Sequence, residues 1–168
     1  MPYEPTAAVL NNIRNTLSNY CIALDTKEFA LLHSVFTKDV VCDYTAVSPT
    51  NPSIVGIEKF LERIQIILKG RITQHALSTQ RLEFSETRDE GVICNAMTYF
   101  TANTFTTEEG GLNHVSVFGY YVDRLKEVDG KWLVFERKVN SFVSILLWLF
   151  VLNLGLKDVR LMSVASED

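Results

Sequence analysis

The sequence predicts a single α+β domain of 168 residues, in which helices pack on one face of a curved antiparallel sheet. Apolar residues recur at helical spacing over residues 7–69, whereas residues 82–139 change to β-prone runs separated by turn signals. Hydrophobic residues make up 47% of the chain and charged residues 21%, which is ordinary for a globular protein and excludes disorder. A curved sheet packed against helices leaves a concave interior, the default place for a small-molecule site.

Three helices are expected before the sheet. The first covers residues 7–24, where apolar side chains form one stripe. Asp25 and Glu28 then resemble an N-cap and its acidic partner, so a second, short helix should follow. The third covers residues 54–69 and ends at Gly70. The buried side of the short helix is expected to carry Phe29, Leu32, Val35 and Phe36.

The strands are predicted from β-prone runs and from the turns between them. A short strand is expected at 40–45, and residues 46–53 form a loop because Ser, Pro, Thr and Asn gather there. Asp129-Gly130 is a strong signal for a tight hairpin. The four main strands are predicted at 82–86, 92–104, 115–128 and 132–139.

Three cysteines, Cys21, Cys42 and Cys94, lie in apolar runs without C-x-x-C spacing. We expect buried free thiols, and hence a reduced, cytoplasmic compartment. A thiol nucleophile is the alternative, although none of the three has an obvious basic neighbour in the sequence. The N-terminus has neither the basic nor the apolar region of a signal peptide.

The segment Phe142–Leu154 is almost entirely apolar but shorter than the roughly 17–25 residues that a membrane span needs. We expect no membrane insertion and interpret it as a buried helix, a pocket lid or a subunit contact. The predicted organisation is a domain at residues 1–140 with a hydrophobic extension at 141–168 that belongs to the same domain.

Charge and motif content exclude several function classes. The chain has 16 basic and 20 acidic residues, a net charge of −4, and no basic patch, so no nucleic-acid partner is expected. His33 and His114 lack metal-ligand spacing to another His or Cys, and we predict no metal. The sequence has no glycine-rich phosphate loop and no G-x-S-x-G elbow.

Several segments, in their order and spacing over roughly residues 10–140, resemble the NTF2-like superfamily and its SnoaL-like branch, which includes scytalone dehydratase. They are the Tyr20–Phe29 segment, the Phe36–Tyr44 segment, Gly56 with Ile57 and Phe60, the Thr-Gln-His of Thr73–His75, and Gly119–Asp123 followed by Asp-Gly-Lys-Trp and Arg137. The resemblance implies a cone-shaped barrel, with a curved antiparallel sheet around N-terminal helices and a central cavity. The Asp-Thr-Lys and Thr-Gln-His motifs are similar to those of small cofactor-free enzymes of fungal secondary metabolism.

The resemblance implies four catalytic residues. His75 would be the acid–base group, since a neutral imidazole titrates near pH 6.5; the alternative is a histidine satisfied by backbone. Asp25 would orient His75, or else cap the second helix. Tyr44 would donate to a substrate oxygen, or else be a core tyrosine with its hydroxyl at the rim.

Arg137 is the fourth, and strand alternation places it on one face with Leu133, Phe135 and Val139. An inward guanidinium needs a partner, so it should bind a carboxylate or an anionic substrate oxygen; a purely structural ion pair is the alternative. The pocket wall is expected to contain Leu24, Phe100, Tyr121 and Phe135.

Two positions depart from the family pattern. Leu24 stands where scytalone dehydratase has a tyrosine, and Ala102 stands at or beside its second histidine. Scytalone dehydratase has a pair of tyrosines and a pair of histidines, and this chain matches only one member of each, Tyr44 and His75. The departures put a dehydration mechanism in doubt.

The function expected from these residues is a cofactor-independent isomerase or cyclase. It would use acid–base catalysis on a bulky polyketide, meroterpenoid or alkaloid intermediate of secondary metabolism. A dehydratase or hydrolase using the same cavity, and a non-catalytic ligand-binding module, remain as alternatives. The expected partners are a small-molecule substrate and a second copy of the chain, because aromatic strands would leave an apolar outer face.

Overall fold

The computed structural model describes residues 3–47, 53–89, 91–108, 111–149 and 160–162. Helix α1 spans Ala7–Thr26, and the Thr6 hydroxyl caps it by accepting from the Val9 amide at 3.3 Å. It ends at Lys27, which adopts the left-handed conformation with φ of 66°. Helix α2 spans Ile57–Leu68.

The short second helix differs from its prediction. It is a 3₁₀ helix, η1, over Phe29–Ser34, and Phe36 already begins the first strand. No side chain caps η1. The Asp25 carboxylate instead bonds to His75, fifty positions further along the chain.

The strands are longer than the sequence predicted. β1 spans Phe36–Asp43, and β2 consists of Ile54–Val55. Because β2 occupies the start of the third predicted helix, α2 begins at Ile57, three residues later than predicted. The main strands are β3 Ile72–Thr87, β4 Gly91–Glu108, β5 Gly111–Val128 and β6 Lys131–Leu149, with a short β7 at Arg160–Met162. Asp129 and Gly130 form the predicted hairpin turn, both with positive φ (51° and 77°).

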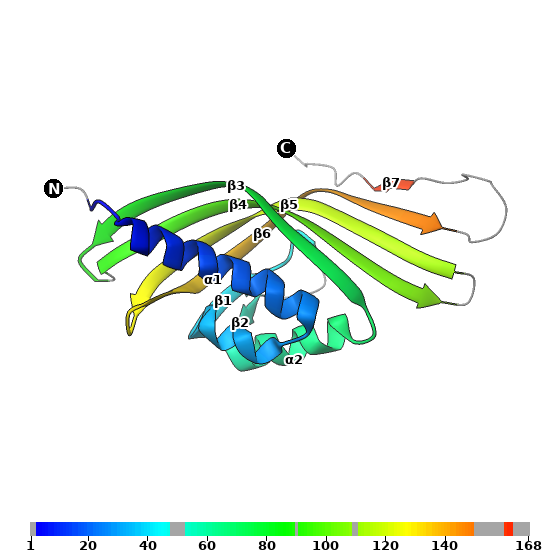
Figure 1. The fold of residues 1–168 in the computed structure, drawn as a ribbon, viewed down its shortest axis with the longest axis horizontal. Coiled ribbons are helices and arrows are strands. Elements are labelled where there is room, and N and C mark those ends of the chain that lie inside the picture. The colour runs from blue at the N-terminus through cyan, green and yellow to red at the C-terminus, as the bar shows by residue number, and fades with distance from the viewer. Residues whose placement is uncertain (1–2, 48–52, 90, 109–110, 150–159, 163–168) are drawn as a thin grey trace.

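The α+β prediction is confirmed. The sheet order is β2-β1-β6-β5-β4-β3, with β7 pairing with β6. All pairings are antiparallel except β1 with β6, which is parallel. The sheet is strongly curved but does not close into a barrel, and β2 and β3 end its main path (Figure 1).

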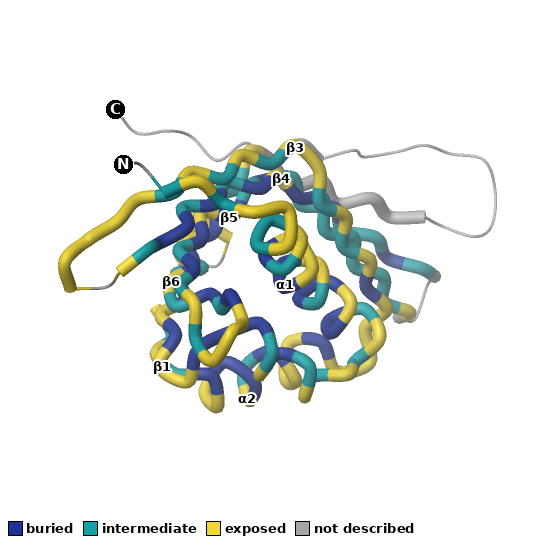
Figure 2. Tube along the Cα trace, turned by 60° about the vertical axis from the view of Figure 1, so that its left-hand side comes forward, coloured by how far each residue is buried: buried dark blue, intermediate teal, exposed yellow. Residues whose placement is uncertain are grey.

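The core lies between the concave face of this sheet and the helices (Figure 2). Helix α1 contributes Ile13, Leu17 and Leu24, all at most 2% exposed. Helix α2 has an apolar stripe that contains Phe60 and Ile64. Because both helices cover one end of a curved sheet, the concave face retains space that side chains do not fill.

Of the three interpretations of Phe142–Leu154, the buried helix is wrong for residues 142–149, which continue strand β6 without a break. β-branched and aromatic residues in this run suit a strand paired with β5. Residues 150–159 and 163–168 lie outside the described residues, so the lid or subunit-contact role remains a prediction. Among the described residues, no helix is long and apolar enough to cross a membrane.

Candidate functional site

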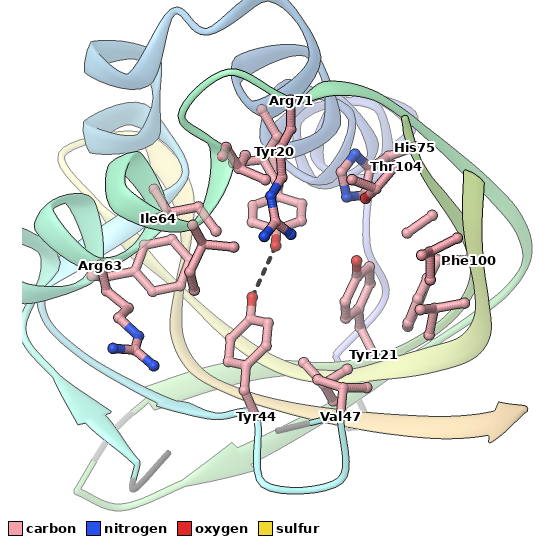
Figure 3. Close-up of a pocket in the computed structure, with 18 of the residues that line it drawn as sticks. Tyr20, Tyr44, Val47, Arg63, Ile64, Arg71, His75, Phe100, Thr104 and Tyr121 are labelled. Carbon is pink, nitrogen blue, oxygen red and sulfur yellow. Dashed lines mark hydrogen bonds between the residues drawn. The ribbon is translucent and has the colours of Figure 1, made fainter. Parts of the chain in front are cut away.

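A cavity of about 430 Å³ lies on the concave side of the sheet, large enough for a small organic molecule. Helix α1 lines it with Tyr20 and Leu24. His75, Phe100 and Tyr121 line it from β3, β4 and β5 (Figure 3). Three of the four predicted wall residues therefore reach the cavity.

Asp25 and His75 form a hydrogen-bonded pair at its edge. The His75 Nδ1 atom lies 2.7 Å from Asp25 Oδ1, and the His75 backbone amide donates to Asp25 Oδ2, also at 2.7 Å. One carboxylate thus holds both the ring and the backbone of the histidine. Because Nδ1 faces a carboxylate, the neutral ring carries its proton there, which leaves Nε2 as a proton acceptor. The alternative of a helix cap for Asp25 is not what the structure shows.

The end of α1 is tied to the start of β3, which fixes this pair. Lys27 Nζ donates to the Leu24 carbonyl and to the Thr73 hydroxyl, both at 2.8 Å. Thr73 Oγ1 also donates to the Leu24 carbonyl at 3.2 Å. Burial lowers the pKa of Lys27, while the nearby Asp25 opposes that shift. Asp25 and His75 therefore sit on two segments that are held together independently of their own bond.

The second polar group is a tyrosine pair. The hydroxyls of Tyr20 and Tyr44 lie 2.9 Å apart (Figure 3). Desolvation raises the pKa of Tyr20, and it raises the pKa of Tyr44 well above the usual value. Both phenols consequently stay protonated and remain hydrogen-bond donors at neutral pH.

Tyr20 is the residue that sequence reasoning missed. It lies one helical turn before Leu24, on the same face of α1. Tyr20 therefore brings its hydroxyl to that of Tyr44 at the cavity wall. The spacing of four residues was a signal that could have revealed it.

Arg137 points inward as predicted but does not line the cavity. Its Nε and Nη2 atoms donate to the two carboxylate oxygens of Asp123 at 2.7 and 2.8 Å. The guanidinium carbon lies 4.1 Å from the ring centre of Tyr20 and 4.3 Å from that of Tyr121. Arg137 is therefore a structural cation behind the tyrosine wall, which corrects its assignment as a catalytic residue touching substrate.

Phe135 is not in the cavity either, which corrects the prediction for that strand. A register shift between Arg124 and Leu125, opposite Glu136 and Val134, leaves Phe135 as an extra residue. This β-bulge reverses the alternation, so Phe135 joins the opposite face. There its ring lies beneath the Arg124 guanidinium, whose carbon is 4.8 Å from the ring centre.

Phe100 and Tyr121 both line the cavity. The rings of Phe100 and Tyr121 stack with centres 4.3 Å apart and an angle of 16°. Gly119 makes this possible, because a Cβ there would clash with the Asn140 carbonyl and lie 2.9 Å from the Phe100 ring. The absence of a side chain lets Phe100 lie flat over the neighbouring strand.

The described residues offer little for a metal or a thiol mechanism. They contain no group of three or more His, Cys, Asp or Glu side chains placed to hold a metal ion. The cysteines are free and buried, as predicted. Burial raises the pKa of Cys21 to about 11 and those of Cys42 and Cys94 to about 12, so all three are protonated at neutral pH.

Comparison with known proteins agrees with this architecture. A crystal structure of the Kfla4162 protein from Kribbella flavida superposes with a TM-score of 0.72 at 16% identity, covering 82% of this chain and 93% of that one. A putative scytalone dehydratase from Novosphingobium aromaticivorans gives 0.68 at 20% identity, covering 94% and 95%. A hexachlorocyclohexane dehydrochlorinase (LinA) of type 2 gives 0.70 at 18% identity, covering 89% and 96%.

At these identities the likeness shows the fold alone. No curated protein matches the sequence. Residues 5–138, however, match the family described as the SnoaL-like domain. This match covers well over half of the chain and shows that the chain belongs to the SnoaL-like domain family.

Proposed function

We propose that the protein is a cofactor-independent isomerase or cyclase in which His75 transfers a proton. The observation that carries the proposal is the 2.7 Å bond between His75 and Asp25, made by a histidine that lines the cavity. A non-catalytic ligand-binding protein has no need of a carboxylate that orients a cavity histidine. His75 and Tyr44 line the cavity, Asp25 bonds to His75, and Arg137 bonds to Asp123 outside the lining, which supports roles for the first three.

In this proposal His75 Nε2 removes a proton beside a carbonyl or hydroxyl and returns it to another atom of the same substrate. Asp25 stabilises the imidazolium that forms between the two steps, because its carboxylate already accepts the Nδ1 proton. The reaction consumes no water and needs no oxidant or reductant. One positioned acid–base group of this kind supplies roughly 10²–10⁴ in rate.

The tyrosine pair supplies the complementary donor. Two hydroxyls carry two protons, and the bond between Tyr20 and Tyr44 uses one of them. The other proton remains for a substrate oxygen on which negative charge develops. Arg137, stacked on the Tyr20 ring, holds that ring in place and favours negative charge nearby.

The walls of the cavity support a bulky, largely apolar substrate. Apolar side chains line most of it, among them Phe60 and Ile64 of α2 and Val117 and Val139 of the sheet. Such walls hold a flexible skeleton in one conformation and so supply orientation. A polyketide, meroterpenoid or alkaloid intermediate of secondary metabolism has this character and is our proposed substrate.

The test is turnover of a panel of such intermediates in D₂O, followed by mass spectrometry. If the proton held by His75 exchanges with solvent before it is returned, the product has the formula of the substrate except that it carries deuterium on carbon. His75→Ala should lose both turnover and labelling. No turnover of any substrate by the wild-type protein would instead favour a non-catalytic binding module.

A dehydratase or hydrolase is the second candidate, and Tyr20 favours it. The hydroxyls of Tyr20 and Tyr44 could together hold a water molecule, as a mechanism like that of scytalone dehydratase requires. Solvent labelled with ¹⁸O separates the possibilities, because a hydrolase incorporates the label, a dehydratase gives a product lighter by one water, and an isomerase does neither.

We also propose that two copies of the chain pair through the outer face of the sheet. Tyr99, Tyr120 and Phe142 cluster there, with ring centres 5.2–6.1 Å apart, and Tyr99 and Phe142 are 38% and 53% exposed. A cluster of exposed aromatic rings supports burial against a partner. Elution from a sizing column at the monomer volume would contradict this proposal.

A further inference from the structure

We infer that the ligand of this cavity carries an anionic group, held at the mouth by Arg71 with Arg63. The inference rests on the proposed function, since it names the substrate's charge. The anionic group is a carboxylate or a group of similar size and charge on an otherwise apolar molecule.

The charge of the cavity lining is the first support. Among the described residues that line it, the ionisable bases are Arg63, Arg71 and His75, and none is acidic. The whole chain has the opposite balance, with 20 acidic and 16 basic residues. A cleft lined by basic side chains attracts anionic ligands even when the protein as a whole has a net negative charge.

The placement of the arginines is the second support. Arg63 lies on α2, and Arg71 lies just after the end of that helix, immediately before β3. Figure 3 shows Arg63 beside α2, with Arg71 drawn between Arg63 and His75. Arg71 precedes His75 by four residues, and both line the cavity. A ligand anchored at Arg71 thus extends along β3 toward the proton-transfer group.

The surface beside the mouth is the third support. Arg71 and Leu68 also line a neighbouring hollow, which contains Lys27 and Lys69 and no acidic side chain among its described residues. Basic charge therefore continues outward from the cavity.

The chemistry of the site favours a carboxylate with an apolar body. A guanidinium presents paired donors that match the two oxygens of a carboxylate. Phe60 and Ile64 of α2, which line the cavity beside these arginines, would contact the apolar part. A neutral ligand of the same shape would make the apolar contacts but would not form a charge-assisted pair with the Arg71 guanidinium.

Isothermal titration calorimetry with two matched probes, biphenyl-4-carboxylate and biphenyl-4-carboxamide, tests the inference. We expect the wild-type protein to bind the carboxylate at least about tenfold more tightly, as a charge-assisted hydrogen bond allows. Arg71→Gln should remove most of this preference and leave the affinity for the amide unchanged. The double variant Arg63→Gln/Arg71→Gln should remove the rest.

Two control variants make the result specific. Arg14→Gln changes the same charge on an exposed part of α1 and should leave the preference intact. His75→Asn should also retain it, so binding is tested separately from proton transfer. Failure of both probes to bind, equal affinity for the two, or a preference lost in His75→Asn but kept in Arg71→Gln would overturn the inference. None of these results depends on turnover, which tests the proposed function alone.

Discussion

Two pairs of a basic and an acidic side chain lie close to the same cavity, and they differ in what surrounds them. The side chains of His75 and Asp25 are 10% and 23% exposed, whereas those of Arg137 and Asp123 are 1% and 0% exposed. His75 lines the cavity, while Arg137 faces a carboxylate and three aromatic rings.

The difference teaches that access, rather than residue type, separates a chemical pair from a structural one. A guanidinium in a closed environment cannot release a proton and does not touch a ligand. The imidazole of His75 lines the cavity, where it can contact a ligand and exchange a proton with it. Substitutions that remove one pair at a time test this distinction.

The largest effect is expected from His75→Ala, which removes the proton-transfer group. With the substrate that the wild type converts, kcat/KM should fall by about 10²–10⁴. His33→Ala on the exposed part of η1 is the matched control and should leave the rate unchanged. Equal rates for wild type and His75→Ala would remove the distinction between the two pairs.

Asp123→Asn attacks the structural pair and should destabilise the fold by about 3–5 kcal/mol, because it leaves the buried Arg137 cation without its carboxylate. Urea denaturation measures the loss. The double variant Asp123→Leu/Arg137→Met should recover much of it, since two apolar side chains need no partner. A double variant no more stable than the single one would show that the pair is required for more than mutual neutralisation.

The tyrosine pair lies between the His75–Asp25 pair and the Arg137–Asp123 pair. Its two hydroxyls can be removed one at a time. Tyr20→Phe/Tyr44→Phe should lower kcat by about 10²–10³, the usual loss for an oxyanion donor. Either single change should cost less, because the remaining hydroxyl can still donate to the substrate. Steady-state kinetics of the three variants gives the comparison, and a double variant as active as wild type would refute the donor role.

The smallest effect is expected from Cys21, whose pKa is influenced by members of both pairs. Burial raises its pKa to about 11; Arg137 opposes this shift and Asp25 adds to it. Since the folded pKa is above the unfolded value, this stabilisation is present at pH 8 and is lost as the pH rises from about 9 to about 11.

Between pH 8 and pH 10 the wild type should therefore lose about 1 kcal/mol more stability than Cys21→Ala. Denaturation at the two pH values measures the difference. A similar loss for both proteins would mean that the Cys21 thiol is not shielded as the structure indicates.

Much of the fold followed from local pattern. The helical stripes of α1 and α2 and the Asp129-Gly130 turn are set by residues close together in the sequence, and these predictions were correct. The prediction for Phe135 was wrong because a β-bulge moves this residue to the other face of the sheet. A bulge depends on the pairing of two strands rather than on either strand alone.

By itself the sequence determined the fold class and three of the groups around the cavity, His75, Asp25 and Tyr44. Only the tertiary structure decided that Arg137 belongs to Asp123 and that Tyr20 completes a pair with Tyr44. The physical reason is that periodicity is a property of neighbouring residues. The partner of a buried charge or hydroxyl is instead chosen by strand register and helix packing, which join segments far apart in the chain.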